Sequence, residues 1–489
     1  MYTPVNYPYT HKPFKHQYDT LVETWEHKSW AFFMEMGTGK SKLLIDSAGL
    51  LYVNQRLDTV VVIAKKGEYA NWAHTQFPEH LPPEFKSQVY LFSTAYYRTA
   101  KGKREFNELV NPNAERRLKV LVINVEALAT APGREALKRV YDASTEGVML
   151  AVDECTCVKN IKAKRSKEAY IWAAKSKYKR IMTGTPITQS PLDLWGQCMI
   201  LGRNMLGFKS FYAFRGRYAE LETKHFGPRA IQVVKKYVNL DELSRLLSTF
   251  STILTKADCL DLPPKVYTKL EVPLTKAQQD LYNQMRDQAM LELDGHEIEV
   301  TNVITQIVKL HQIACGQLKL DEKTYRSVEN NRLPTLLELL EDYPGKVLIW
   351  ANYRQTLEDV VEALREKYGD ESVGPYYGGV PDTERAETVR RFQDPADPLR
   401  FFVSNPMSGG YGLTLTEANL VVYYSNSYNL EHRLQSEDRA HRIGQDDKVT
   451  YVDLVSPDTV DVRILKVLRD KKSLADTIIN AASVRDLLY

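Results

Sequence analysis

The chain has 489 residues, of which 43% are hydrophobic and 26% are charged, and its formal net charge is +3. This length exceeds what one hydrophobic core supports, so we expect two or three domains, and the near-neutral charge confines any nucleic-acid surface to a local stripe. No apolar run approaches the roughly 20 residues of a membrane span and the first residues lack a secretion signal, so we expect an intracellular protein that contacts no membrane.

The first part of the chain shows the alternation of an α/β domain. Short apolar runs rich in Val, Ile and Leu are separated by longer helical patterns, and we expect strands at residues 30–34, 59–64, 119–124, 148–153 and 180–183. Because these runs lack in-and-out alternation, they are typical of a parallel sheet that helices cover on both faces.

A candidate phosphate-binding loop follows the first expected strand. The chain reads Glu35-Met-Gly37-Thr38-Gly39-Lys40-Ser41 and then begins a helical pattern. The glycines let backbone N–H groups curl around phosphate oxygens, the Lys40 ammonium would reach the β- and γ-phosphates, and the Ser41 hydroxyl would bind Mg²⁺. Met34 occupies the place of the usual first glycine, but the strand-to-helix context favours an ATP site at this loop.

Two acidic residues lie at the carboxyl end of the fourth expected strand, where α/β sheets present their ligand-binding groups. There Asp153 would hold Mg²⁺, and Glu154 would orient and polarise the attacking water. The alternative for this pair is a solvated acidic turn. The next strand runs into Thr183-Gly-Thr-Pro186, whose hydroxyls could relay the state of the γ-phosphate or could simply form a turn.

The strand rhythm is lost between about residues 191 and 330, where the pattern is helical. The two prolines of Leu262-Pro-Pro-Lys265 stop a helix and favour an extended link, so we place the crossing between domains there. A second α/β domain follows, with strands expected at residues 346–350, 401–404, 419–425 and 450–455 and helices at 353–368 and 460–488.

Near its carboxyl end the chain reads Gln435-Ser-Glu-Asp-Arg439-Ala-His-Arg442-Ile-Gly-Gln445, which predicts a polar helix with two arginines three residues apart on one face. By itself this would be a charged surface helix. Together with a phosphate loop, two planar and permanently charged guanidinium groups suit the stabilisation of charge on a γ-phosphate. Because loop and arginines fall in different α/β domains, we expect closure of the two domains to assemble the ATPase site.

The order of these motifs resembles the Swi2/Snf2 branch of the superfamily 2 helicase-like ATPases. The resemblance extends from about residue 14 to residue 474, and it rests on Gln17, 36–41, 153–156, 183–186, 262–265, 408–415 and 435–445. It implies two RecA-like parallel-sheet lobes with helical protrusions between them, and ATP-driven translocation along duplex DNA, usually without strand separation. It places lobe 1 at 1–262 with a protrusion at about 191–262, a linker and the protrusion of lobe 2 at 263–332, and lobe 2 at 333–489.

The resemblance also implies roles for individual residues. Gln17 would read the adenine, and the phosphates and Mg²⁺ would be held by Gly37, Thr38, Gly39, Lys40, Ser41 and Asp153. Glu154 would complete the hydrolytic pair, the γ-phosphate would be contacted by Gln435, Arg439 and Arg442, and Gly410 and Gly412 match a motif that senses nucleotide and DNA. DNA contacts would be made by Lys65, Lys66, Trp72, Asn352 and Tyr353. Thr156 stands where His is usual and Thr414 where Asn is commoner, and neither change removes a group needed for hydrolysis.

Two further stretches could contribute to a nucleic-acid surface. Residues 159–180 carry nine basic residues against one acid, and residues 208–218 mix aromatic with basic side chains. The alternatives are a solvated helix face for the first stretch and core packing for the second. Since no zinc-finger or RNA-recognition pattern is present, we expect recognition through the phosphate backbone.

The sequence therefore predicts a DNA-dependent ATPase that uses ATP and Mg²⁺ to translocate on double-stranded DNA and to remodel or displace bound proteins. Two alternatives are open: a helicase that separates DNA or RNA strands, and a nucleic-acid-binding or polymerase-binding scaffold that uses ATP only as a switch. We expect a cytoplasmic, nucleoid-associated monomer of bacterial or viral origin, whose protein partner would be bound to DNA, such as a polymerase.

Overall fold

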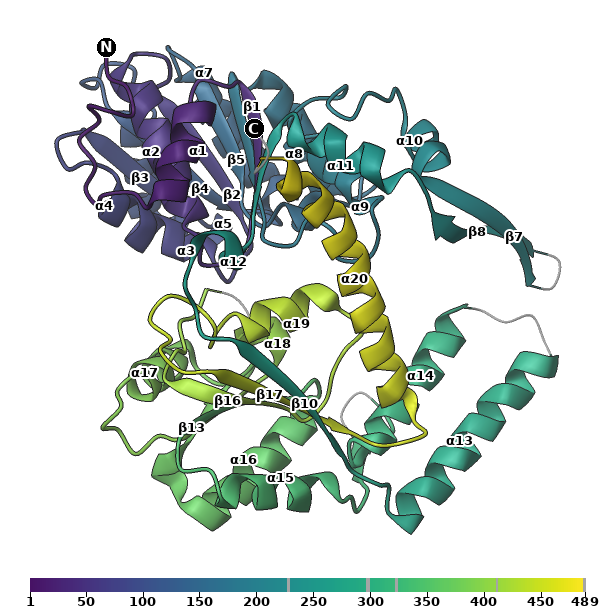
Figure 1. Cartoon of the computed structure of the whole chain (residues 1–489). Coiled ribbons are helices and arrows are strands. Elements are labelled where there is room, and N and C mark those ends of the chain that lie inside the picture. The colour runs from purple at the N-terminus through teal and green to yellow at the C-terminus, as the bar shows by residue number, and fades with distance from the viewer. Residues whose placement is uncertain (227–228, 296–299, 322–323, 410–411, 487–489) are drawn as a thin grey trace. The chain divides into compact units, whose positions relative to one another are not determined.

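In the computed structural model the chain divides into two compact units, each built around its own parallel sheet (Figure 1). The structure describes residues 1–226, 229–295, 300–321, 324–409 and 412–486. Unit 1 comprises Met1–Glu220, Lys236–Leu260 and Leu474–Tyr489, and unit 2 comprises Leu221–Lys235 and Asp261–Ser473. The expected class, an α/β protein with two parallel sheets, is confirmed.

Unit 1 contains a seven-stranded parallel sheet with the strand order β3-β4-β2-β5-β6-β1-β9. Its strands are β1 (Ser29–Met34), β2 (Thr59–Ala64), β3 (Ser87–Phe92), β4 (Leu118–Asn124), β5 (Val148–Val152), β6 (Tyr178–Met182) and β9 (Ser251–Leu254). The five strands expected here are present, with ends within two residues of the prediction. The sequence missed β3 and β9 because these edge strands are partly exposed and carry no continuous buried run.

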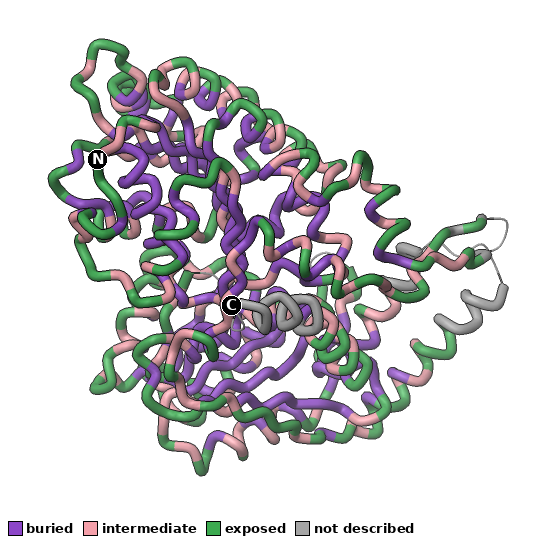
Figure 2. Tube along the Cα trace, turned by 45° about the horizontal axis from the view of Figure 1, so that its top comes forward, coloured by how far each residue is buried: buried purple, intermediate pink, exposed green. Residues whose placement is uncertain are grey.

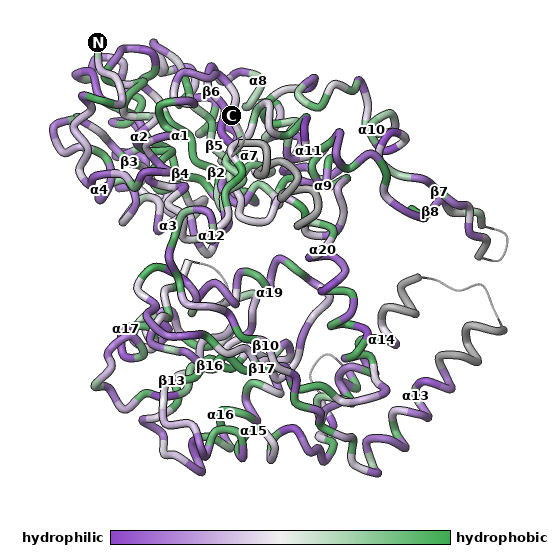
Figure 3. Tube along the Cα trace, viewed as in Figure 1, coloured by the Kyte–Doolittle hydropathy of each residue, from purple (hydrophilic) through white to green (hydrophobic). Residues whose placement is uncertain are grey.

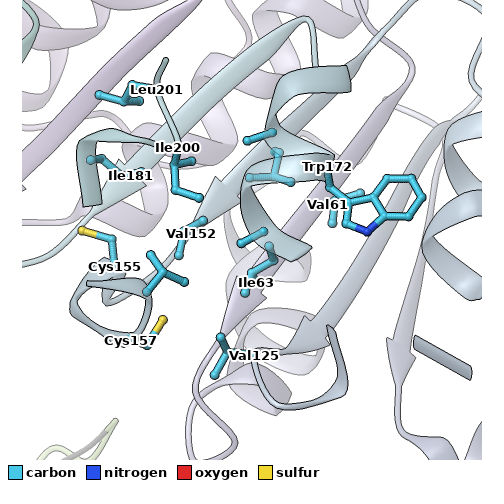
Figure 4. Packing of buried hydrophobic residues seen from close by; sticks show 14 of the residues in the cluster. Val61, Ile63, Val125, Val152, Cys155, Cys157, Trp172, Ile181, Ile200 and Leu201 are labelled. Carbon is cyan, nitrogen blue, oxygen red and sulfur yellow. The ribbon is translucent and has the colours of Figure 1, made fainter. Parts of the chain in front are cut away.

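Helices cover both faces of this sheet, and a separate hydrophobic cluster lies on each face. One face is covered by α1 (Lys15–Thr24), α2 (Lys40–Val53) and α4 (Phe77–His80). The other is covered by α6 (Ala100–Leu109), α7 (Ala131–Asp142), α8 (Lys164–Lys175), α9 (Asp193–Cys198), α10 (Phe211–Tyr218) and α11 (Leu240–Ser248). Figure 4 shows part of the second cluster, in which Ile63 and Val152 of the central strands belong with Trp172 of α8. Burial on both faces explains the unbroken apolar runs of the central strands.

The middle of the chain is only partly helical, which corrects the expectation for residues 191–330. An antiparallel hairpin of β7 (Ala219–Phe226) and β8 (Arg229–Tyr237) follows α10, and a second short pair is formed by β11 (Gln317–Lys319) and β12 (Tyr325–Ser327). These strands pair only with each other, and β8 and β12 leave most of their described side chains exposed. No buried apolar period therefore reveals them in the sequence.

Unit 2 contains a six-stranded parallel sheet with the strand order β10-β17-β16-β13-β15-β14. Its strands are β10 (Lys265–Glu271), β13 (Lys346–Trp350), β14 (Val373–Tyr376), β15 (Phe401–Ser404), β16 (Ala418–Tyr423) and β17 (Val449–Val455). The four strands expected in this region are present. The sequence missed β14, an edge strand whose Gly and Pro hide its pattern, and β10, which begins directly after the two prolines and exposes most of its side chains.

The helices of unit 2 include α13 (Lys276–Gly295), α14 (Val300–Ala314), α15 (Arg332–Glu341), α16 (Arg354–Tyr368), α17 (Asp382–Phe392), α18 (Pro406–Gly409) and α19 (Leu430–Glu437), and α20 (Val460–Asp486) ends the described chain. The expected apolar face of α16 is buried, including Leu357 and Val361. Figure 2 shows the buried residues along the sheets, and Figure 3 shows that the same strands are hydrophobic. Within the described ranges, no helix is long and apolar enough to cross a membrane.

Candidate functional site

The loop between β1 and α2 has the backbone of a phosphate cradle. Gly37 (φ 79°) and Gly39 (φ 86°) adopt the left-handed conformation, which side chains with a Cβ rarely tolerate, and α2 begins at the next residue. The Lys40 ammonium lies against the loop, donating to the carbonyls of Met34 at 2.8 Å and Glu35 at 3.1 Å. The Thr38 hydroxyl donates to Glu35 O at 2.7 Å. The amino-terminal end of a 14-residue helix and a lysine thus meet at one loop, an arrangement suited to phosphate oxygens.

Gln17, the expected adenine contact, lies against this loop. Its Nε2 donates to Thr38 O at 3.1 Å, and its Oε1 accepts from the Phe14 N–H at 3.0 Å. His16 makes a 2.8 Å hydrogen bond to the same Thr38 carbonyl, and its ring stacks with the half-exposed ring of Phe14. A Cβ added to Gly39 would approach Gln17 Nε2 to 1.9 Å. The start of α1 and the phosphate loop therefore pack against each other.

The acidic pair lies at the carboxyl end of β5, as expected. Asp153 Oδ1 accepts from the Glu154 N–H at 3.0 Å, and its Oδ2 accepts from the Trp72 indole N–H at 2.7 Å. Burial raises the pKa of Asp153, against the opposing effects of the Trp72 hydrogen bond and the Lys40 charge. Lys40 is thus close enough to act electrostatically on Asp153. Ser41 and Asp153 offer the one hydroxyl and one carboxylate that Mg²⁺ commonly takes beside phosphates and water.

Glu154 is held in a strained and buried position. Its backbone is left-handed (φ 45°), and its side chain is 4% exposed. A non-glycine residue in this conformation persists only where its surroundings fix it, which is common at reactive sites. The Thr183 hydroxyl donates to Glu154 Oε2 at 2.8 Å and also accepts from the Thr185 N–H at 3.1 Å. The Thr183-to-Pro186 turn thus contacts the acidic pair and is more than a simple connection.

The same turn also packs on the phosphate loop. A Cβ added to Gly184 would lie 3.0 Å from the Met36 nitrogen, so the two backbones are in close contact there. On its other side, the loop is tied to α12 (Lys256–Cys259), because the Lys256 N–H donates to Glu35 Oε2 at 2.7 Å. Within unit 1 the phosphate loop therefore lies beside Gln17 and, through the Thr183-to-Pro186 turn, beside the acidic pair.

The residues expected to contact DNA occupy different environments. Lys66 is exposed and Lys65 is partly buried, but Trp72 is only 2% exposed and is bonded to Asp153. In unit 2 the Asn352 N–H and side-chain amide donate to Ser425 Oγ at 3.0 and 3.4 Å. The Tyr353 hydroxyl is 2.7 Å from His311 Nδ1, and burial raises the pKa of Tyr353. Of the five, only Lys66 is exposed, while the charge of partly buried Lys65 acts on Asp153.

The two arginines of unit 2 do not lie on a helix, which corrects the prediction for residues 435–445. Helix α19 ends at Glu437, and the chain continues in turns to Gly444, whose φ is 94°. The arginines nevertheless meet, because Arg439 Nη1 and Arg442 Nη1 both donate to Leu413 O, at 2.8 and 3.0 Å. Burial and the neighbouring charge of Arg439 lower the pKa of Arg442.

Gln435 and the glycine motif lie beside this arginine pair. Arg439 Nε donates to Gln435 O at 2.9 Å, and the Gln435 side chain is fully buried. Gly412, which precedes the shared Leu413 acceptor, has a φ of 69°. Gly410 lies outside the described residues. In unit 2 the three expected γ-phosphate contacts and Gly412 thus gather at one place.

A buried charge network in unit 2 was missed by the sequence reasoning. Glu437 accepts from Arg433 Nε at 2.7 Å and from the Tyr267 hydroxyl at 2.7 Å, and Lys265 Nζ lies 3.4 Å from it. His441 Nε2 makes a 2.7 Å hydrogen bond to Pro263 O. The Leu-Pro-Pro-Lys stretch is therefore bonded to the arginine segment. Both stretches were recognised as motifs in the sequence, and they were the signal from which a contact between them could have been predicted.

Part of the basic stretch 159–180 is used inside unit 1. Lys159 bonds to Thr188 and Asp193, Lys177 donates to two backbone carbonyls, and Arg180 is fully buried against the end of α1. In the aromatic stretch, Phe214 and Tyr218 are core residues, whereas Tyr212 is 70% exposed. Core packing thus accounts for most of the aromatic residues. No group of three or more potential His, Cys, Asp or Glu metal ligands occurs in the described part of the chain.

Comparison with known proteins gives two domain matches, an SNF2-related domain over residues 20–318 and a helicase conserved C-terminal domain over residues 330–444. The putative ATP-dependent helicase/translocase YwqA of Bacillus subtilis is 28% identical over 371 residues, which are 73% of this chain and 38% of YwqA. The human DNA annealing helicase and endonuclease ZRANB3 is 26% identical over 91% of this chain and 38% of its own length.

Two further matches are a chromatin-remodeling subunit and a solved structure of an ATPase core. The SWI/SNF chromatin-remodeling complex subunit snf22 of Schizosaccharomyces pombe is 25% identical over 68% of this chain and 21% of its own length. A solved structure, the Sulfolobus solfataricus SWI2/SNF2 ATPase core in complex with dsDNA, aligns with 98% of this chain and 95% of that chain at 21% identity, with a TM-score of 0.43. This chain spans less than two fifths of the length of each of the three curated relatives.

Proposed function

We propose that this chain, which belongs to the SNF2-related family of ATP-dependent helicases and translocases, is a DNA-dependent ATPase that translocates on double-stranded DNA and displaces bound proteins. Family membership establishes an enzyme that hydrolyses ATP; the DNA track and the displaced proteins are the proposal. The observation that supports ATP hydrolysis by this chain is the acidic pair Asp153-Glu154, fixed beside the phosphate loop by hydrogen bonds from Trp72 and Thr183. The DNA track is proposed from the family match and from relatives such as the DNA annealing helicase ZRANB3.

In the proposed mechanism, Lys40 and the loop amides bind the β- and γ-phosphates, and Ser41 and Asp153 hold Mg²⁺. When bound, Mg²⁺ supplies charge neutralisation of the phosphates. Glu154 orients the attacking water and accepts its proton at a carboxylate oxygen. The Thr183 hydroxyl at Oε2 fixes the orientation of that carboxylate, so that its position does not depend on the water.

We also propose that Arg439 and Arg442 stabilise the negative charge that develops on the γ-phosphate. Their convergence on one carbonyl supports this role, because it holds two guanidinium groups at a single point of unit 2. The same proposal has three further parts. Lys65 and Lys66 contact the DNA backbone, the protein acts as a monomer on a DNA-bound protein such as a polymerase, and it associates with the nucleoid.

The first test is ATP turnover measured without nucleic acid and with duplex DNA, single-stranded DNA or RNA. We expect the strongest stimulation by duplex DNA. Glu154→Gln should lower kcat by about 10² to 10⁴, while Glu115→Gln, the same change at an exposed site of unit 1, should leave it unchanged. Normal DNA-stimulated turnover by the Glu154 variant would refute the assigned role.

The second test separates translocation from unwinding. Triplex displacement reports movement along a duplex, and strand displacement reports separation of its strands. We expect triplex displacement without strand displacement. Strand separation without triplex displacement would favour the helicase alternative, and the absence of multiple ATP turnovers would favour the scaffold alternative.

A further inference from the structure

Trp72 makes a contact that a surface nucleic-acid-binding residue would not make. Its indole N–H donates to Asp153 Oδ2 at 2.7 Å, and its side chain is almost fully buried. The other carboxylate oxygen accepts from the Glu154 N–H. A carboxylate held at both oxygens has a fixed plane, yet it keeps lone pairs for a further ligand. Trp72 thus sets the orientation of the acid that is proposed to hold Mg²⁺.

The segment that carries Trp72 begins at the two lysines proposed to contact DNA. Lys65 and Lys66 directly follow β2, and the Lys65 carbonyl accepts from the N–H groups of Glu68 and Tyr69, at 2.9 and 3.0 Å. A continuous helical segment follows, consisting of α3 (Tyr69–Asn71), a π-helix (Trp72–Gln76) and α4. Its hydrogen bonds make it a short, stiff connection from the lysine turn to Trp72.

The π-helix lies at the point where the segment meets the acidic pair. Its wide turn is closed by the Phe77 N–H, which donates to the Trp72 carbonyl. Single π-turns within α-helices are uncommon and occur often at functional sites. The strand before the lysine turn and the strand before the acidic pair are neighbours, since β2 pairs with β5 and the Asp153 N–H donates to Ile63 O at 2.8 Å. The lysine turn and the acid therefore follow adjacent strands of one sheet, and Trp72 joins them.

We propose that Trp72 is a positioning residue that holds the Asp153 carboxylate for Mg²⁺ and links this acid to the lysine turn at Lys65 and Lys66. A displacement of the lysine turn by bound DNA would pass along the helical segment to the indole and so to Asp153. This inference rests on the proposed function of Asp153. It assigns to Trp72 an indirect part in catalysis in place of the direct DNA contact expected from the sequence.

The test compares Trp72→Phe with Trp172→Phe. Both changes replace a buried indole of unit 1 by a smaller ring, but the Trp172 N–H has no hydrogen-bond partner among the described residues. Affinity for a fluorescent ATP analogue is measured with Mg²⁺ and with EDTA. We expect Trp72→Phe to reduce the gain in affinity caused by Mg²⁺ about tenfold, with little change in EDTA. Trp172→Phe should bind like the wild type in both conditions.

Turnover supplies a second readout. Trp72→Phe should raise the Mg²⁺ concentration for half-maximal ATPase at least fivefold and reduce the stimulation by duplex DNA, whereas a purely structural role would lower activity at every Mg²⁺ concentration alike. Equal losses in the two variants, or an unchanged Mg²⁺ dependence in Trp72→Phe, would overturn the proposal. Failure of the wild type to respond to DNA would count against the proposed function, while the binding experiment would still report on Trp72.

A spectroscopic test covers the case in which Trp72→Phe does not fold. The wild-type protein labelled with ¹⁵N in its six tryptophan indoles gives one N–H signal for each. Asp153→Asn should shift one of these signals, because it replaces the charged acceptor of the Trp72 hydrogen bond. Glu115→Gln, at an exposed site of unit 1 outside this helical segment, should shift none of them. If no indole signal responds to Asp153→Asn, the hydrogen bond does not form and the inference is wrong.

Discussion

Glu437→Gln tests the buried network that ties the Leu-Pro-Pro-Lys stretch to the arginine segment. Glu437 is 3% exposed, and its carboxylate is surrounded by Arg433, Lys265 and Tyr267. Burial acts to raise the pKa of Glu437, but the positive charges of Lys265, Arg433 and Lys472 and the Arg433 hydrogen bond outweigh it and hold that pKa at about 2 against an ordinary 4.5. A shift of this size corresponds to about 3 kcal/mol of stability. Removal of one partner from a buried ion pair gives a similar figure, about 3 to 5 kcal/mol.

The expected result is a large loss of thermal stability at pH 7. In a domain of 150 to 250 residues each kcal/mol corresponds to about 2 to 4 °C, so Glu437→Gln should lower the melting temperature of unit 2 by about 6 to 12 °C. Differential scanning calorimetry measures this shift. Glu338→Gln makes the same change at an exposed position of the same unit, and it should shift the melting temperature by less than about 2 °C.

The pH dependence gives the same reasoning a second check. Because the pKa of Glu437 is lower in the folded than in the unfolded state, its contribution is full above about pH 4.5 and is lost as the pH falls towards 2. The difference between wild type and variant should therefore be constant above pH 5 and shrink below 4.5. A melting temperature within 2 °C of the wild type at pH 7 would refute the assigned role of the network.

Three further predictions concern other sites. Burial lowers the pKa of His311 to about 4 from 6.5. The free energy of unfolding should therefore be highest above pH 6.5 and fall by about 3 kcal/mol as the pH drops to 4. Urea unfolding at several pH values measures this slope, and His311→Asn should remove it. Gly39→Ala should weaken ATP binding at least tenfold in equilibrium titrations because its Cβ would collide with Gln17, whereas Gly207→Ala, which also has a positive φ but open space around its Cβ, should bind ATP normally. Arg442→Lys should lower kcat about 10³-fold with a nearly unchanged KM for ATP, since a lysine lacks the planar guanidinium fork; a wild-type kcat would remove Arg442 from the mechanism.

The nucleotide site could be predicted from the sequence because its chemistry depends on local spacing. The glycines around Thr38, the adjacent Lys40 and Ser41, and the acids after β5 are each set by a few consecutive residues at a strand end. Continuous apolar runs likewise revealed the central strands, which are buried on both faces. Edge strands and isolated hairpins escaped prediction because they bury too little side-chain surface to leave a period in the sequence.

The sequence by itself determined the two-sheet α/β class, the phosphate loop and the acidic pair, because backbone periodicity and contiguous motifs carry that information. Only the tertiary structure decided which distant side chains meet. Trp72 and Asp153 are 81 residues apart, and Lys265 and Glu437 are 172 apart. Such partners depend on strand order and on where each helix ends, and α19 ends before Arg439, so helical spacing misplaced the arginines that the fold nevertheless joins at Leu413.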